Sequence, residues 1–253
     1  MNKITLITGA TSGIGRSCAY IFSDKKHDLI LTGRREERLS EIAQELTSKF
    51  GVKVLTLCFD IRDNKEVKKA ISSIPDEWQK IEILINNAGL AVGLNTVQDG
   101  IVDDWDRMID TNVKGLLYLS RAVLPFMVMG KKGHVINIGS IAGKEVYPNG
   151  NVYCATKFAV DAITKAMRID LVKEGIKVTQ LAPGAIETEF SMVRFKGDME
   201  KAGVVYNGYK PLDPEDVAEI AHYVTTLPPH VNINDMVIMP TAQASSTVFN
   251  KNS

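Results

Sequence analysis

The chain has 253 residues, 45% of them hydrophobic, which allows a sizeable core and lies outside the range of disordered sequences. Its 30 basic and 30 acidic side chains balance, so the charge gives no reason to expect nucleic acid or an anionic membrane as a partner. The N-terminal apolar stretch is too short for a signal peptide and no run of about 18 apolar residues is present, so we expect no membrane contact and a cytoplasmic location.

Short, continuously apolar runs alternate with amphipathic stretches along the whole chain. The expected strands are Ile4–Thr8, Leu29–Thr32, Val54–Phe59, Ile83–Asn86, His134–Ile138, Val178–Ala182 and Met236–Met239. The expected helices are Ile14–Lys25, Arg35–Phe50, Lys65–Ser73, Val102–Val128, Val152–Glu174 and Pro214–Thr225. Strands without alternation are covered on both faces, so residues 1–253 are predicted to form one α/β domain with a doubly wound parallel sheet of about seven strands, a Rossmann fold.

Three local features modify this pattern. Pro125 should end or kink its helix near the close, because proline cannot donate the helical hydrogen bond. Asp213 suits the N-cap of the last helix, with Pro214 at its first position. The segment Glu187–Lys210 has no clean strand pattern, and a long insertion in a compact domain is usually a lid or substrate loop.

The first strand is followed by glycines at positions 9, 13 and 15, spaced G-x-x-x-G-x-G. In the first βα turn of such a sheet, backbone N–H groups and the helix N-terminus face an anion. Gly9 would permit the turn, Gly13 would let a pyrophosphate approach, and Gly15 would let the helix pack near the strand. Glycines needed for turn geometry alone are the alternative interpretation.

The end of the second strand indicates which dinucleotide binds. NAD-binding folds place an acidic residue there for the ribose 2′-hydroxyl, but Gly33 stands at this point, followed by Arg34 and Arg35. Guanidinium groups pair well with phosphate oxygens, so the sequence favours NADP. The alternative is that the arginines belong to a solvated helix start.

Two further strand ends carry polar residues. Asp60 follows the third strand and can accept a hydrogen bond from the adenine amino group, or cap the next helix. Asn86, Asn87 and Gly89 follow the fourth strand, which indicates a polar turn near the cofactor.

The fifth strand ends at Ser140, and Tyr153 and Lys157 follow one helical turn apart on one face of a helix. A nearby ammonium group favours the phenolate and would lower the pKa of Tyr153, so that the phenol can act as a general acid or base. Ser140 would bind the same substrate oxygen. Surface packing and capping are the alternative roles for these residues.

In this order and spacing, "TGATSGIG", "NNAG", Ser140, "YCATK" and "LAPGAIET" resemble the short-chain dehydrogenase/reductase family over nearly the whole chain. The resemblance implies a catalytic set of Ser140, Tyr153 and Lys157, with Asn112 helping to hold a proton-relay water. It also implies NADP-binding residues, which are Gly9, Thr11, Ser12, Gly13, Ile14, Gly15, Arg34, Arg35, Asp60, Ile61, Asn87, Ala88, Gly89, Tyr153, Lys157, Pro183, Gly184, Ile186 and Thr188.

Within that family, "NNAGLAVG", "EFSMVRFKGD" and "TLPPHVNINDMVIMPT" resemble the NADP-dependent 3-hydroxy acid dehydrogenases, which act on serine and L-allo-threonine. The expected reaction moves a hydride between the C3 alcohol of a small 3-hydroxy acid and the nicotinamide. A reductase for acyl or apolar ketones and a non-catalytic NADP-binding regulator are the alternatives.

A carboxylate substrate requires a cation, and Arg194 in the irregular segment is the candidate. The alternative is a solvated loop arginine. Tyr147 and Asn151 are further candidates for lining the substrate pocket.

The resemblance implies a homotetramer. The cysteines, Cys18, Cys58 and Cys154, are expected to be buried free thiols, because they lie far apart without a CxxC pair. The four histidines show no metal-ligand spacing, so we expect no metal site.

Overall fold

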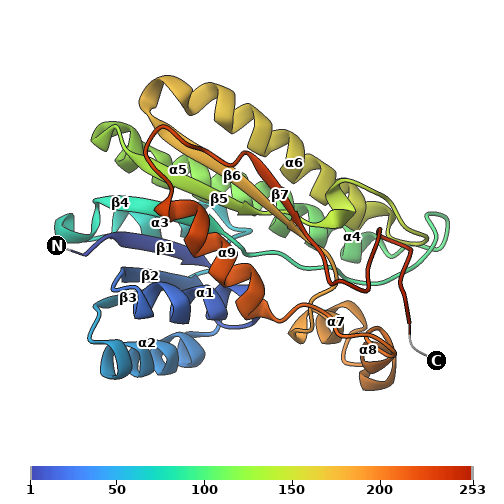
Figure 1. The fold of residues 1–253 in the computed structure, drawn as a ribbon. Helices are drawn as coiled ribbons and strands as arrows, with labels where there is room; N and C mark the ends of the chain where they lie inside the picture. Colours follow the sequence, from blue (N-terminus) through green and yellow to red (C-terminus); the bar gives the residue numbers. More distant parts are fainter. Residues whose placement is uncertain (1, 252–253) are drawn as a thin grey trace.

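The computed structural model describes residues 2–251, apart from the side chains at positions 201 and 202. Within them a seven-stranded parallel sheet has the order β3-β2-β1-β4-β5-β6-β7 (Figure 1). Its strands are β1 (Ile4–Thr8), β2 (Asp28–Gly33), β3 (Val54–Cys58), β4 (Ile81–Asn86), β5 (Gly133–Ile138), β6 (Ile176–Pro183) and β7 (Asp235–Ile238). All seven expected strands are confirmed, and the strand order reverses between β1 and β4, which creates a crevice for ligands at the carboxyl ends.

Helices cover both faces of the sheet. They are α1 (Gly13–Asp24), α2 (Glu36–Phe50), α3 (Asn64–Ser72), α4 (Val102–Ile109), α5 (Leu116–Gly130), α6 (Asn151–Leu171), α7 (Glu189–Arg194), α8 (Met199–Val204) and α9 (Pro214–Thr226). In Figure 1, α1, α2 and α9 lie on one face, with α3, α5 and α6 on the other.

Each face has its own hydrophobic core, which explains the continuously apolar strands. In β1, Leu6 belongs to the core under α3, α5 and α6, and the next residue, Ile7, to the core under α1, α2 and α9. Successive side chains of a strand point to opposite faces, so a strand with helices on both sides is apolar at every position.

The long fourth helix differs from its prediction. A π-helical turn, Asp110–Gly115, separates α4 from α5. Pro125 lies inside α5, which continues to Gly130, so the proline does not end the helix. Val123 and Met127 are fully buried on either side of it, and this packing outweighs the local preference of proline.

By length and composition alone, the helical run Val102–Gly130 is apolar enough to cross a membrane, contrary to the sequence-based expectation. Its most apolar window is 33% buried in the structure. Leu119 and Val123 of α5 are fully buried in the core between this helix and the sheet. The apolar composition of the run therefore also suits a helix that packs on the sheet.

The segment Glu187–Lys210 contains two short helices, α7 and α8, where no element was predicted. Six residues are too few to show a helical pattern in sequence. Tertiary contacts hold the segment instead, since the Tyr206 hydroxyl donates to the Ile186 carbonyl (2.6 Å) and also bonds the Ser191 hydroxyl (2.7 Å).

Two smaller predictions can be compared with the structure. Asp213 does begin α9, and its N–H donates to the Asp216 carboxylate at 2.8 Å. All three cysteines are free, and Cys18 and Cys154 are buried, but Cys58 is exposed because it ends the edge strand β3.

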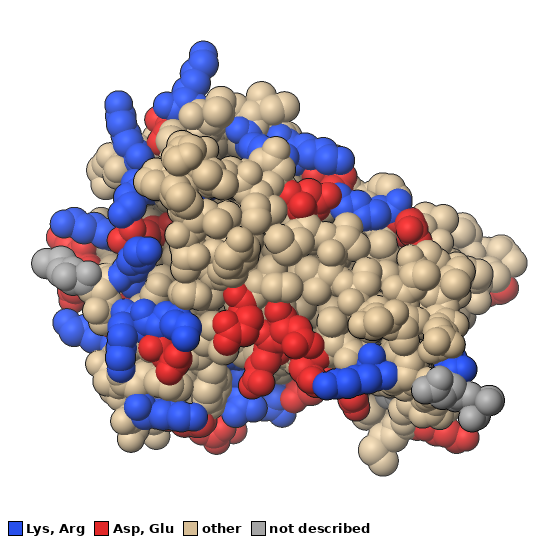
Figure 2. All heavy atoms as spheres, in the orientation of Figure 1, with Lys and Arg blue, Asp and Glu red and all other residues tan. Residues whose placement is uncertain are grey.

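On the face shown in Figure 2, acidic side chains lie among the basic ones, which are more numerous toward one side.

Candidate active site

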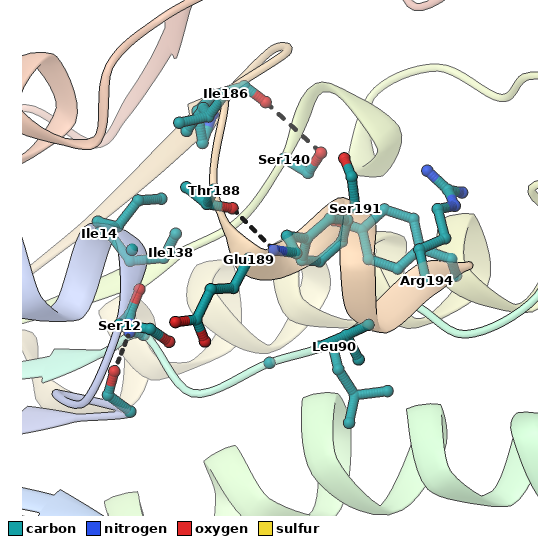
Figure 3. A pocket seen from close by; sticks show the side chains of 18 of the residues that line it. Ser12, Ile14, Leu90, Ile138, Ser140, Ile186, Thr188, Glu189, Ser191 and Arg194 are labelled. Atoms are coloured by element: carbon teal, nitrogen blue, oxygen red, sulfur yellow. Dashed lines mark hydrogen bonds between the residues drawn. The ribbon is translucent and has the colours of Figure 1, made fainter. Parts of the chain in front are cut away.

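A cavity of about 840 Å³ opens along the carboxyl ends of the strands, a typical size for a small-molecule site. Every predicted cofactor-binding residue except Gly15 lines it, from Arg34 after β2 to Thr188 beyond β6. Figure 3 shows Ser140 and Arg194 among its side chains, while Glu189 points from α7 toward Ser12.

The glycine turn forms one wall of the cavity. Gly9 and Gly13 have φ values of +64° and +50°, a conformation that favours glycine, and both line the cavity. Gly15 does not, because a Cβ there would stand 2.3 Å from the Gly9 carbonyl oxygen. Its role is therefore to let α1 approach the turn, as predicted for the helix–strand contact.

A side chain at the end of β2, where an NAD site has its acidic residue, would be crowded. A Cβ on Gly33 would already stand 3.1 Å from Cγ2 of Thr11. Arg34 is 57% exposed in its side chain, and its Nη1 lies 3.8 Å from the carboxylate of Asp60. It is therefore well placed to turn toward a phosphate.

Arg35 is more firmly held than Arg34. Its Nη2 donates to the hydroxyls of Thr11 (2.6 Å) and Ser12 (3.0 Å), and its Nη1 to the carboxylate of Glu189 (3.0 Å). The guanidinium thus connects the glycine turn to the first residue of α7.

Asp60 lines the cavity but does not cap the following helix, because Asp63 does so by accepting from the N–H of Lys65 at 2.7 Å. Arg62 donates two hydrogen bonds to the Asp60 carboxylate, from Nε at 3.0 Å and from Nη2 at 2.6 Å. Burial opposes ionisation, but the hydrogen bonds from Arg62 outweigh it and hold the pKa of Asp60 below its usual value.

The turn after β4 is fixed to the glycine turn. The Thr8 hydroxyl accepts from the N–H groups of Asn87 and Ala88, both at 2.9 Å, and the Asn87 amide donates to the Thr8 carbonyl at 2.9 Å. Asn86 instead bonds Ser120 and Asn137 inside the core, at 3.0 and 2.8 Å. Only the second asparagine of the pair thus reaches the cavity.

The predicted catalytic side chains converge. Ser140 follows β5 at the start of a 3₁₀ turn, and Tyr153 and Lys157 project from α6, so that all three line the cavity. The Lys157 ammonium donates to the carbonyl of Ile138 at 2.9 Å and lies 6.0 Å from the centre of the Tyr153 ring.

The electrostatics of this group differ from the prediction. Burial raises the pKa of Tyr153, and neither the Ser140 hydrogen bond nor the Arg194 guanidinium reverses this. Burial also lowers the pKa of Lys157 to about 8. The expected lowering of the Tyr153 pKa by Lys157 is absent, because the ammonium bonds Ile138 and lies near the ring rather than at the hydroxyl.

Asn112 lies in the π-helical turn, a feature that often marks functional sites. Its side chain bonds both the N–H and the carbonyl of Leu90 at 2.8 Å, and the Thr156 hydroxyl at 3.0 Å. These bonds fix the loop that carries Gly89, where a Cβ would stand 3.2 Å from Oδ1 of Asn112.

Arg194 of α7 lines the cavity beside Tyr147 and Tyr153. Its guanidinium lies 5.2 Å from the ring centre of Tyr147 and 5.5 Å from that of Tyr153, and it donates to the Tyr147 hydroxyl. No acceptor among the described residues reaches its buried Nε. Contrary to the prediction, Asn151 does not line this cavity, and its amide donates to the Asn95 carbonyl at 2.8 Å.

Several lining residues were not predicted. Tyr206 and Tyr209 follow α8, and Gln243, Ser246 and Phe249 come from the C-terminal segment. These positions carry no spacing motif in the sequence. Within the described residues, no group of three or more His, Cys, Asp or Glu side chains is arranged to hold a metal ion.

Comparison with known proteins agrees with this geometry. Residues 3–198 match the sequence model of the short chain dehydrogenase family. Sulfoacetaldehyde reductase 2 of Chromohalobacter salexigens is 47% identical over 97% of each chain. The NADP-dependent 3-hydroxy acid dehydrogenase of Escherichia coli K12 is 47% identical over 95% of this chain and 96% of that protein.

The closed form of a serine dehydrogenase complexed with NADP⁺ superposes with a TM-score of 0.91, at 45% identity over 99% of this chain and 100% of that one. The chain therefore belongs to the short-chain dehydrogenase family, and it is an oxidoreductase that uses NADP.

Proposed function

We propose that this chain is an NADP-dependent oxidoreductase that interconverts a small 3-hydroxy acid and its 3-oxo acid. The observation that carries the substrate assignment is Arg194, whose guanidinium reaches the cavity beside Tyr147 and Tyr153 with its buried Nε unpaired. A cation next to the catalytic phenol suits a substrate with an anionic group close to its reacting carbon.

The residues of the cavity fit NADP. The glycine turn is free of side chains where a pyrophosphate approaches a helix N-terminus. Gly33 leaves no acid for a ribose 2′-hydroxyl, while Arg34 is exposed and paired only at 3.8 Å. When bound, the nicotinamide supplies the hydride chemistry.

The protein moves the proton. In the reducing direction, Tyr153 donates its phenolic proton to the substrate oxygen and Ser140 holds that oxygen by a hydrogen bond. Because burial raises the pKa of Tyr153, the phenol is protonated at neutral pH, which suits reduction. Oxidation needs the phenolate, so we expect its kcat to rise with pH above neutrality while that of reduction does not.

Lys157 would supply positive charge near the nicotinamide ribose of the bound cofactor. Its pKa of about 8 lets it exchange a proton close to neutral pH. Asn112 has its side-chain amide fully engaged with Leu90 and Thr156. A role for this residue in holding a relay water therefore falls to its backbone carbonyl.

The first experiment is a steady-state assay that follows the formation of NADPH from NADP⁺ or of NADH from NAD⁺. Its substrates are L-serine, L-allo-threonine, 3-hydroxyisobutyrate and 3-hydroxypropionate, with Tyr153→Phe as the inactive control. Turnover with NAD⁺ only would contradict our interpretation of Gly33 and Arg34. Reduction of an apolar ketone without any turnover of a hydroxy acid would move the assignment to the alternative class of carbonyl reductases.

The 47% identity to a sulfoacetaldehyde reductase favours a second substrate, because a sulfonate is also an anion that a guanidinium binds. Sulfoacetaldehyde with NADPH is therefore included in the same assay. The substrate with the higher kcat/KM decides between a carboxylate and a sulfonate.

Arg194 is tested by substitution. Arg194→Ala should raise KM for the anionic substrate by at least about tenfold, the loss expected for a charge-assisted pair. Lys196→Ala is the matched control, since this lysine lies on the same segment but pairs with Asp104 at 2.8 Å, outside the cavity. An unchanged KM in Arg194→Ala would show that the arginine does not bind substrate.

We also propose a cytoplasmic homotetramer. Apolar side chains remain exposed on the outer faces of two long helices, among them Leu117 (41%) and Met129 (77%) of α5 and Phe158 (42%) and Ile169 (74%) of α6. Exposed apolar surface of this kind marks protein–protein contacts. Light scattering on the purified protein and on Phe158→Glu tests the assembly, and a wild-type monomer would contradict it.

A further inference from the structure

The chain beyond β7 returns to the catalytic end of the sheet. Residues 240–251, here termed the C-terminal arm, run past α7 and α8 in Figure 1. They lie outside residues 3–198, which match the family sequence model. Any role they have in the site is therefore not implied by the family motifs.

The arm is a tight antiparallel hairpin. Gln243 and Phe249 pair across it, and the N–H of Ala244 donates to the carbonyl of Val248 at 2.9 Å. Paired residues of an antiparallel bridge present their side chains on the same side. Both Gln243 and Phe249 accordingly line the cavity.

The arm is attached to the loops that carry the catalytic groups. The Gln243 amide oxygen accepts from the N–H of Ala185, beyond β6, at 2.8 Å, and Gln243 is buried. The Ser246 N–H donates to the carboxylate of Glu145 at 2.8 Å, and its hydroxyl to the Val146 carbonyl at 3.2 Å. The hairpin thus spans from the end of β6 to the loop between Ser140 and Tyr147.

The arm also contacts the segment Glu187–Lys210. The ring of Phe249 lies 5.0 Å from that of Tyr209 at a tilt of 46°, and the ammonium of Lys251 lies 5.6 and 5.9 Å from the two ring centres. Phe249 and Tyr209 both line the cavity. An aromatic pair therefore joins the arm to the segment that follows α8 and walls the cavity between them.

We propose that Phe249 is a specificity-determining residue, whose ring sets the upper size limit of the substrate. The proposal rests on the proposed function, because it takes short 3-hydroxy acids as the substrates that fit. Arg194 would bind the acid group and Ser140 and Tyr153 the reacting oxygen, so that the remaining alkyl group extends into the cavity that Phe249 lines. A longer alkyl chain meets that ring.

The test compares two substrates of one series, 3-hydroxybutyrate and 3-hydroxyhexanoate, in the wild type and in Phe249→Ala. We expect the ratio of kcat/KM for the longer over the shorter acid to rise at least about tenfold in the variant, the discrimination that a pocket wall achieves against extra methylene groups. Val248→Ala is the matched control, since Val248 is 57% exposed and does not line the cavity. Its ratio should equal that of the wild type.

Binding of NADPH, followed by fluorescence, separates specificity from folding. The hydrogen bonds that hold the arm go to Ala185, Glu145 and Val146 and not to the glycine turn or Arg34, so Phe249→Ala should bind NADPH as the wild type does. Equal ratios in Phe249→Ala and Val248→Ala, or a loss of NADPH binding in Phe249→Ala, would overturn the proposal. Phe249→Leu gives an intermediate ratio if ring size is what matters.

The same design keeps this proposal distinct from the function on which it rests. If the wild type oxidises no hydroxy acid but reduces ketones, the ratio is measured with 2-butanone and 2-hexanone instead. If the ratio of kcat/KM for 2-hexanone over 2-butanone rises in Phe249→Ala, Phe249 limits substrate size even though the hydroxy acid assignment fails.

Discussion

The buried ammonium of Lys157 costs stability, and its removal should make the cofactor-free protein more stable. Lys157 is only 7% exposed, and burial lowers its pKa to about 8 from the usual 10.5 of a lysine. At about 1.4 kcal/mol for each pH unit, the charged lysine destabilises the folded state by about 3 kcal/mol at neutral pH. Lys157→Met keeps the chain length and removes the charge.

The substitution also removes one hydrogen bond. The Ile138 carbonyl loses its ammonium donor at 2.9 Å, and an unsatisfied buried acceptor costs about 1–2 kcal/mol. The net expectation is that Lys157→Met raises the free energy of unfolding by about 1–2 kcal/mol at pH 7 while it abolishes turnover.

The pH dependence gives the sharper test. Between the folded pKa of about 8 and the unfolded value of 10.5, the unfolded wild type binds more protons than the folded one, so wild-type stability rises with pH across this window. The advantage of Lys157→Met should therefore be complete below pH 8 and shrink above it. At the top of the window the lost hydrogen bond should leave the variant the less stable protein.

Urea unfolding of both proteins without cofactor, at one fixed protein concentration and several pH values, measures this difference. Lys173→Met, in the exposed turn that continues α6, is the control and should show no such trend. A variant less stable than the wild type at neutral pH, with a difference that does not change with pH, would refute this reasoning.

Three other substitutions test the cofactor side of the cavity. Gly15→Ala would force a Cβ to within 2.3 Å of the Gly9 oxygen, so it should lower stability by about 1–3 kcal/mol in thermal unfolding, whereas Gly130→Ala, which meets no atom within 4 Å, should not. Arg34→Ala should raise KM for NADP⁺ at least about tenfold and leave KM for NAD⁺ nearly unchanged, and equal effects on both would show that Arg34 does not bind the 2′-phosphate. Glu189→Gln breaks ion pairs to Arg35 (3.0 Å) and Arg38 (2.9 Å) that link α7 to the cofactor end, so stopped-flow fluorescence should show faster release of NADPH, with Glu187→Gln as the control that leaves it unchanged.

The sheet could be predicted from sequence because its cause is local and repeated. The inner strands are almost completely buried, as the patterns of β1 and β6 show, because helices cover both faces of the sheet. Apolar residues are therefore frequent at successive positions of these strands. Pro125 shows the limit of local reasoning. Its propensity is overruled by the burial of Val123 and Met127, which belong to the same core as Leu84 of the earlier strand β4.

The cofactor half of the cavity was also accessible from sequence. A phosphate-binding turn needs glycines at short, fixed spacings before a helix N-terminus. Gly9 and Gly13, which have positive φ, can therefore be recognised in the sequence as a motif. The same reasoning did not separate Arg34 from Arg35. That difference arises because Thr11, Ser12 and Glu189 engage Arg35, and Glu189 is over 150 positions away in the chain.

The substrate half is a different kind of construction. Tyr147, Arg194 and Phe249 come from three segments with no fixed spacing between them, and they line one cavity because the strand order places the ends of β5, β6 and β7 side by side. Asn151 stands two residues from Tyr153, yet it faces Asn95 instead of the cavity. Nearness in sequence to Tyr153 therefore does not predict a place in the cavity wall. This is why the reaction type follows from short motifs while the choice of substrate depends on side chains that only the folded chain assembles.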